Sequence, residues 1–193
     1  MRGRMPRKIV VPHALYAKEL LYIESSGTQY INTGVVPTAN TRFVVGFQMV
    51  SPSTANEAVV SAVQFSFRYY GANSCFRSNS SNQVDFSTAI DASAYHTAEK
   101  SATGCTIDGT YSVTNTAGST SYPLFAFAHN ASGTASNFAK VKIYSLKIYE
   151  NNVLVWDYIP VLDHAGVACL YDKVTKELYY NAGSGAFSYG EAA

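Results

Sequence analysis

Apolar and polar residues alternate with a period of two along most of the chain after residue 20, which is the pattern of half-buried β-strands. The clearest runs predict strands over residues 43–49, 59–69, 144–149 and 153–159. In the last run both alternating sets are fairly apolar, which indicates a central strand covered on both faces. Turn-forming residues separate the runs at 25–27, 108–109, 151–152 and 181–183. The pattern therefore predicts an all-β sandwich or barrel.

One stretch near the C-terminus, CLYDKVTKELYYNAGSG, places a charged turn between two apolar segments. It predicts a hairpin of strands 167–171 and 177–180 joined by residues 172–176. We expect Leu170 and Leu178 both to face the core. Gly183 and Gly185 follow, and substitution there should be resisted wherever the glycine adopts positive φ.

Composition narrows the functional classes. The chain has 193 residues, enough for one domain with a sizeable core, and its 47% hydrophobic content argues against disorder. The net charge of +1 creates no field that would attract nucleic acid. No apolar run approaches the length of a membrane-spanning helix. We therefore expect neither nucleic acid nor a membrane as a partner.

No cofactor or metal is predicted. The cysteines are Cys75, Cys105 and Cys169. They are far apart and belong to no Cys/His cluster, so a zinc site is disfavoured and free buried thiols are favoured. One disulfide with a leftover thiol is the alternative. Asp157, Asp163 and Asp172 are the acids that could contact calcium, but no dense run of acidic residues is present.

Two segments resemble a known family. Residues 20–47 read LLYIESSGTQYINTGVVPTANTRFVVGF, and residues 142–187 read KIYSLKIYENNVLVWDYIPVLDHAGVACLYDKVTKELYYNAGSGAF. Together they resemble the concanavalin A-like lectin/glucanase domain in its laminin-G-like form, of the kind found in proteins of gut bacteria and in phage virions. Residues 48–141 match only loosely. The resemblance implies a jelly roll of two antiparallel sheets over residues 20–193, with the first and last strands side by side.

The resemblance also defines what an enzyme of this family would need. Its glucanases place acids spaced Glu-x-Asp-x-x-Glu on one strand, where two of them act as nucleophile and acid/base. Here the 13 acidic residues are scattered and form no such cluster. A nucleophile elbow of the G-x-S-x-G kind is absent too, although a Ser/His/Asp triad built from separate segments stays open. We expect a protein without catalytic activity.

Aromatic residues supply a candidate binding surface. Fifteen tyrosines and one tryptophan provide rings that can stack on sugars. Alternation places Phe65, Phe67, Tyr144 and Trp156 in the core or on a sheet face. The candidate glycan-binding residues lie beside a predicted loop and are Arg68, Tyr69, Tyr70 and Asn73. Core packing is the competing interpretation for them.

The N-terminal arm, residues 1–19, is the candidate docking element. Its basic and aliphatic residues are Arg2, Arg4, Arg7, Lys8, Ile9, Val10 and Val11. Exposed ion pairs contribute only about 0–1 kcal/mol each, whereas a buried aliphatic side chain contributes roughly 1.5–3 kcal/mol. A basic stretch followed by an apolar anchor therefore predicts a tether that docks on a partner.

The leading functional hypothesis is a non-enzymatic structural protein of a phage virion, as a capsid decoration, head fibre or tail-associated protein with weak host-glycan binding. Its expected partners are other virion proteins and further copies of itself, because the sparsely charged segment 177–190 would leave an exposed sheet edge. Such a protein would be assembled in the host cytoplasm. The alternative is a carbohydrate-binding adhesion module of a gut bacterium, secreted or at the cell surface.

Overall fold

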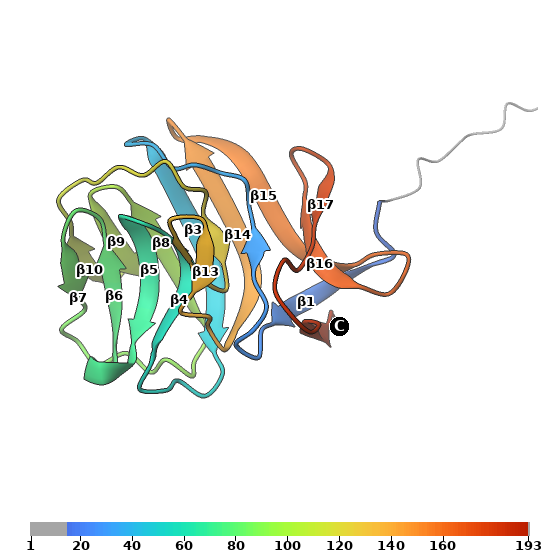
Figure 1. The fold of residues 1–193 in the computed structure, drawn as a ribbon, viewed down its shortest axis with the longest axis horizontal. Coiled ribbons are helices and arrows are strands. Elements are labelled where there is room, and N and C mark those ends of the chain that lie inside the picture. The colour runs from blue at the N-terminus through green and yellow to red at the C-terminus, as the bar shows by residue number, and fades with distance from the viewer. Residues whose placement is uncertain (1–14, 193) are drawn as a thin grey trace, which may run out of the picture.

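The computed structural model describes residues 15–192 as a sandwich of two β-sheets (Figure 1). The larger sheet contains β1 (Lys18–Glu24), β3 (Thr41–Met49), β8 (His96–Ser101), β9 (Gly104–Ile107), β10 (Tyr111–Thr114), β14 (Val141–Glu150), β15 (Val153–Leu162), β16 (Ala168–Asp172), β17 (Glu177–Tyr179) and β18 (Ser188–Glu191). The smaller sheet contains β2 (Ile31–Asn32), β4 (Asn56–Ala62), β5 (Phe65–Tyr70), β6 (Cys75–Asn79), β7 (Gln83–Asp85), β11 (Phe125–Ala126), β12 (His129–Ala131) and β13 (Thr134–Ser136). The predicted all-β sandwich is confirmed.

Helical structure is limited to one 3₁₀ turn, η1 (Gly71–Asn73), within the part of the chain that the structure describes. No described helix has the length and apolar character needed to span a membrane. Between the strands of residues 15–192, every pairing is antiparallel except that of β12 with β4.

The larger sheet joins the two ends of the domain. Its strands follow the order β10-β9-β8-β3-β14-β1-β15-β16-β17, and β18 pairs with β1. Ile23 lies opposite Tyr189, and Glu24 lies opposite Ser188. The expectation that the first and last strands lie side by side is therefore confirmed. Strand β1 begins at Lys18, so Lys18 and Glu19 already belong to the sheet.

Apolar side chains from the facing sides of the two sheets form the main core. Phe47 of β3 makes edge-to-face ring contacts with Phe67 of β5 and Phe76 of β6, at centroid distances of 5.3 and 5.5 Å. All three rings are at most 1% exposed. Phe65 is also buried, as the alternation predicts. These aromatic contacts fix the separation of the two sheets beneath β5 and β6.

The strand predicted over 59–69 is in fact a hairpin. Strands β4 and β5 pair with Ala62 opposite Phe65, so the chain reverses at Val63 and Gln64. Gln64 adopts a φ of 57°, in the left-handed region that favours glycine and asparagine. Val63 and Gln64 are not residue types that favour turns, and the apolar/polar alternation continues through both. For this reason the sequence predicted one strand where there are two.

The last predicted run, 153–159, is a central strand as expected, because β15 lies between β1 and β16. Its first residues are not covered on both faces, however. Val153 is 63% and Leu154 is 36% exposed, next to the turn at Asn151 and Asn152. Full burial begins at Asp157. The first residues of β15 are therefore apolar although they are exposed in the described part of the protein.

Strands β16 and β17 form the predicted hairpin, but their register corrects one prediction. Leu170 is fully buried in the main core. It pairs with Tyr179, whereas Leu178 pairs with Tyr171. Because directly paired residues share a face, Leu178 lies on the opposite side of the sheet, in a smaller cluster with Tyr171 and Cys169. The expectation that Leu178 faces the core is wrong.

This register predicts unequal effects of two matched substitutions. Leu170→Ala should lower the free energy of unfolding by about 2–5 kcal/mol, because it opens a cavity in the core. Leu178→Ala should cost about 1 kcal/mol, since its side chain is half-buried and solvent can fill the space. Denaturant unfolding of both variants measures the difference. Equal losses would mean that both leucines face the core.

The two glycines after β17 are constrained for different reasons. Gly185 has a φ of 73°, as anticipated. Gly183 does not have positive φ, but a Cβ at this position would lie 2.2 Å from the carbonyl oxygen of Thr28. A close backbone approach, not left-handed geometry, therefore requires glycine at Gly183.

Candidate functional site

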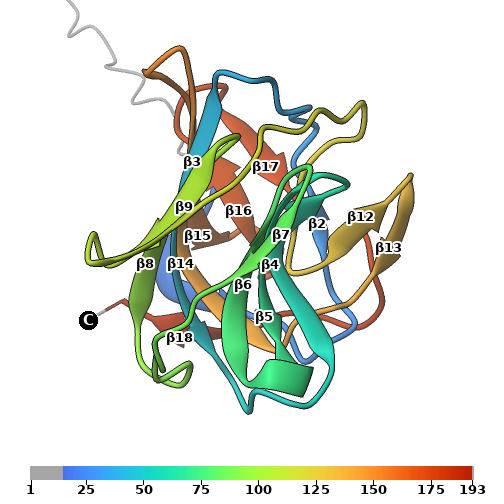
Figure 2. The same ribbon diagram turned by 90° about the vertical axis from the view of Figure 1, so that its left-hand side faces the viewer.

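The outer side of the smaller sheet carries a band of polar side chains. In β5, Phe67 and Tyr69 are buried, whereas Arg68 and Tyr70 point the other way and are half-buried. The register places Arg68 opposite Arg77 of β6, and Arg77 opposite Asp85 of β7. Figure 2 shows these strands side by side. We call this band the polar face; it consists of the accessible Arg68, Tyr70, Arg77, Asp85 and His129 together with the buried Ser61, Ser66 and Asn79.

Three of the four candidate glycan-binding residues lie at this surface. Arg68 and Tyr70 belong to the polar face, and Asn73 is exposed in η1 immediately after β5. Tyr69 is only 8% exposed and packs edge-to-face on Phe76, with a centroid distance of 5.6 Å. Tyr69 is therefore a core residue, and the competing interpretation holds at that position.

An ion pair that the sequence analysis missed organises the middle of the polar face. The Arg77 guanidinium binds the Asp85 carboxylate through two hydrogen bonds, of which Nη2–Oδ2 measures 3.0 Å. These bonds hold the pKa of Asp85 below its ordinary value. The guanidinium carbon also lies 3.4 Å from the centroid of the Tyr70 ring. Arg77 thus covers one face of that ring and leaves Asp85 ionised at neutral pH.

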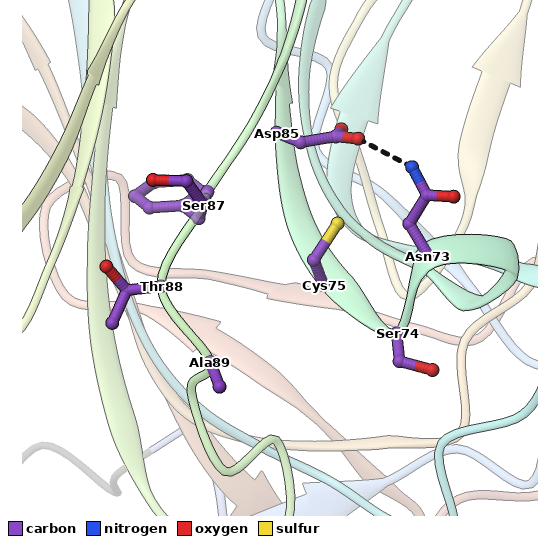
Figure 3. Close-up of a pocket in the computed structure, with 8 residues that line it drawn as sticks. Asn73, Ser74, Cys75, Asp85, Ser87, Thr88 and Ala89 are labelled. Carbon is purple, nitrogen blue, oxygen red and sulfur yellow. Dashed lines mark hydrogen bonds between the residues drawn. The ribbon is translucent and has the colours of Figure 1, made fainter.

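A shallow recess of about 320 Å³ adjoins this ion pair, between η1 and the segment 86–89 (Figure 3). Asn73 Nδ2 donates a hydrogen bond of 3.0 Å to Asp85 Oδ2, and both side chains line the recess. Cys75 also lines it, and burial raises the pKa of this thiol above its ordinary value. The recess therefore offers amide, carboxylate and hydroxyl groups next to the ion pair whose Arg77 covers the Tyr70 ring.

The serine and histidine of the polar face do not form the catalytic triad that the sequence left open. Ser61 Oγ lies 2.6 Å from His129 Nδ1, but Ser61 is fully buried and cannot reach a substrate. Burial, and then the charge of Arg68, lower the pKa of His129 to about 4, which makes it a weak base at neutral pH. Among residues 15–192, no carboxylate is hydrogen-bonded to His129.

His96 is buried and has a structural role. His96 Nδ1 lies 2.7 Å from Asp108 Oδ2, and Nε2 lies 2.7 Å from the carbonyl oxygen of Asp91. Both ring nitrogens are therefore occupied, and no serine hydroxyl is bonded to either. The pair joins β8 to the turn that follows β9.

The three acids considered as calcium ligands bind protein groups instead. Asp172 accepts hydrogen bonds from its own turn, and Asp163 accepts backbone N–H groups of Ala165 and Val167, both at 2.8 Å. Those backbone bonds lower the pKa of Asp163. Asp157 pairs with Lys173 at 3.1 Å. No group of three or more His, Cys, Asp or Glu side chains suited to a metal occurs in the described part of the chain.

The thiols are free. Cys105 and Cys169 are buried and Cys75 is half-buried, so the disulfide alternative is not realised in the structure. The Cys75 side chain reaches the recess described above.

A second aromatic surface lies on the outer side of the larger sheet. Tyr144 contacts Tyr22 and Tyr95, with ring centroids 5.3 and 5.0 Å apart. Tyr95 is 55% exposed. It lies over Gly46, where a Cβ would come within 2.8 Å of the Tyr95 hydroxyl. The prediction for Tyr144 is confirmed as a sheet-face position, and Trp156 packs half-buried against the core. We call Tyr22, Tyr95 and Tyr144 the tyrosine row.

The predicted docking residues of the arm lie outside the described residues. They are Arg2, Arg4, Arg7, Lys8, Ile9, Val10 and Val11. Their role as a tether stays a prediction.

Comparisons with known proteins identify the fold. No family model matches the sequence, and no curated protein matches it. A crystal structure from Bacteroides ovatus, described as a "putative carbohydrate binding protein", matches with a TM-score of 0.64 at 8% sequence identity. The match covers 90% of this chain and 61% of that one, so the chain spans about three fifths of the length of that protein. At this identity the match shows a shared fold, a two-sheet β-sandwich consistent with the concanavalin A-like resemblance.

Proposed function

We propose that this domain is a carbohydrate-binding module and that its binding surface is the polar face with the adjoining recess. The observation that carries the proposal is that Asn73 and Asp85 line one recess, while Arg77 joins Asp85 to the ring of Tyr70 on the neighbouring part of the polar face. One aromatic ring beside several hydrogen-bonding groups suits a sugar, which has both apolar ring faces and hydroxyl edges. The description of the Bacteroides ovatus protein supports the same function.

The proposed module binds without cleaving. Glycoside hydrolysis requires two carboxyl groups about 5–9.5 Å apart on either side of the scissile bond. On the polar face the carboxylate is that of Asp85, and Arg77 and Asn73 already bind both of its oxygens. The buried Ser61 and weakly basic His129 offer no nucleophile in its place. Recognition is therefore the function that these residues support.

The proposal favours the adhesion module of a gut bacterium, at the cell surface or secreted. The virion hypothesis depends on the family resemblance and on the arm, and it stays a prediction together with its virion partners and self-association. Many copies of the module would be needed both on a bacterial cell surface and on a virion. A weak sugar site becomes effective when many copies act together, on a cell or on a particle.

Binding of the purified protein to an oligosaccharide array, followed by calorimetry on the best ligand, tests the function. Tyr70→Ala and Asn73→Ala should each raise the Kd by roughly tenfold, a loss typical of central contact residues. Tyr95→Ala, in the tyrosine row, is the matched control and should leave the Kd unchanged.

Melting temperatures of the three variants separate lost contacts from lost folding. If Tyr95→Ala abolished binding while the polar-face variants bound normally, the site would belong to the tyrosine row. If no oligosaccharide bound at all, the proposed function would be wrong.

A further inference from the structure

Arg68 is a cation without an acidic partner in the middle of the polar face. Its Nε donates a hydrogen bond of 2.9 Å to Ser66 Oγ. With the Asn79 amide oxygen turned toward it, Nη2 donates a second bond of 3.3 Å. Both acceptors are neutral, and no carboxylate of residues 15–192 lies within ion-pair distance of Arg68. The side chain is half-buried, so its positive charge is partly removed from water without a neighbouring negative charge to balance it.

The neighbouring charges increase this imbalance. Arg77 lies directly opposite Arg68 on the adjacent strand. The positive charge of Arg77 is balanced by the carboxylate of Asp85. Burial, and then Arg77, lower the pKa of Arg68 to about 10, so the group remains charged at neutral pH. His129, the other titratable neighbour, is neutral there. The surroundings of Arg68 therefore favour an added negative charge.

An unpaired, half-buried cation weakens folding, which points to a role in binding rather than in stability. A guanidinium presents a planar fork of N–H donors that matches a carboxylate or a sulfate. On β5, Arg68 and Tyr70 point to the same side and stand about 7 Å apart along the strand. One sugar unit can therefore contact the ring and place its acidic substituent at the guanidinium.

We infer that the glycan recognised by the polar face is acidic, and that Arg68 binds its carboxylate or sulfate group. The inference rests on the proposed carbohydrate-binding function and specifies its ligand class.

Calorimetry with the full chain tests it on three tetrasaccharide probes that differ in charge. The probes are a galacturonate tetrasaccharide, its fully methyl-esterified neutral form, and a sulfated heparin tetrasaccharide. We expect at least one acidic probe to bind about tenfold more tightly than the ester, with the advantage shrinking as salt rises. The two acidic probes distinguish a carboxylate from a sulfate.

Variants then assign the preference to one side chain. Arg68→Gln should remove the tenfold advantage, and Arg68→Lys should retain part of it. Arg42→Gln is the control, because Arg42 sits on the other sheet, paired with Glu99 at 3.0 Å. The melting temperature of Arg68→Gln should be unchanged or higher, since the substitution removes an uncompensated charge.

Failure of the inference can be distinguished from failure of the function. If the neutral ester bound as tightly as both acidic probes, or if Arg68→Gln kept the preference, the acidic-ligand inference would be overturned and the module would remain a sugar binder. If none of these probes and no oligosaccharide on the array bound, both proposals would fail.

Discussion

Replacing Asp172 with alanine should lower the free energy of unfolding by about 3–5 kcal/mol. The carboxylate is fully buried at the end of β16. Oδ1 accepts the backbone N–H groups of Asp157 and Val174 at 2.7 and 3.0 Å, and Oδ2 accepts the N–H and hydroxyl of Thr175 at 3.1 and 2.7 Å. Alanine would leave the buried N–H of Asp157 without a partner, which costs about 1–3 kcal/mol, and would also remove the three bonds that hold the exposed turn at Val174 and Thr175.

Chemical unfolding in the presence and absence of calcium checks this expectation. Asp163→Ala is the matched control, because Asp163 also caps a turn through two backbone N–H groups but lies at a more exposed position. Asp163→Ala should lower the free energy of unfolding by about 1 kcal/mol. A large effect of Asp172→Ala that appeared only with calcium would instead identify Asp172 as a metal ligand.

Replacing Lys100 with methionine should stabilise the protein at neutral pH, by up to about 3 kcal/mol. Lys100 is fully buried between the sheets, and its Nζ donates to Ser80 Oγ at 2.9 Å and to the carbonyl oxygen of Ser101 at 2.6 Å. No carboxylate among the described residues pairs with it. Burial therefore lowers the pKa of Lys100 from 10.5 to about 8. Methionine has a similar volume and carries no charge.

The gain should depend on pH in a defined direction. Below pH 8 both the folded and the unfolded protein carry the charged lysine, so the cost of burying the charge is present in full. Between pH 8 and 10.5 the unfolded state binds more protons than the folded state, and the stability of the natural protein rises. The advantage of Lys100→Met should therefore shrink across this window. Urea unfolding of both proteins from pH 7 to 9.5 measures the difference in their free energies of unfolding. Tyrosine titration affects both proteins equally and cancels in this difference. A difference that stayed constant with pH would refute the assignment.

Local residue chemistry explains which turns could be predicted. Asp108 and Gly109, and likewise Asn151 and Asn152, adopt positive φ at the anticipated hairpin turns, because these residue types tolerate it. Gln64 adopts the same geometry with no local signal, since the pairing of β4 with β5 imposes it. The position of Leu178 depended on register, which alternation alone does not determine.

The candidate site, too, could be predicted from the sequence only in part. Arg68, Tyr70 and Asn73 could be found because they are polar or aromatic residues beside a loop. The ion pair of Arg77 with Asp85 could not be predicted, because the Ser- and Asn-rich stretch 71–82 resembles a loop but contains β6, and Asp85 lies in the short strand β7 that follows it. The tyrosine row comes from three separate segments, and only the folded sheet brings them together.

The pairing of β1 with strands from the end of the chain constrains how the protein is made. Among residues 15–192, β1 pairs with β14, β15 and β18, and Ile23 pairs with Ile143, about 120 residues later in the chain. On the ribosome, β1 therefore emerges long before any strand that can pair with it. Such distant contacts make folding slow, and the unpaired strand is exposed to other chains meanwhile. A ribosome that stalls before residue 141 would release a chain whose first strand has no partner and is prone to aggregate.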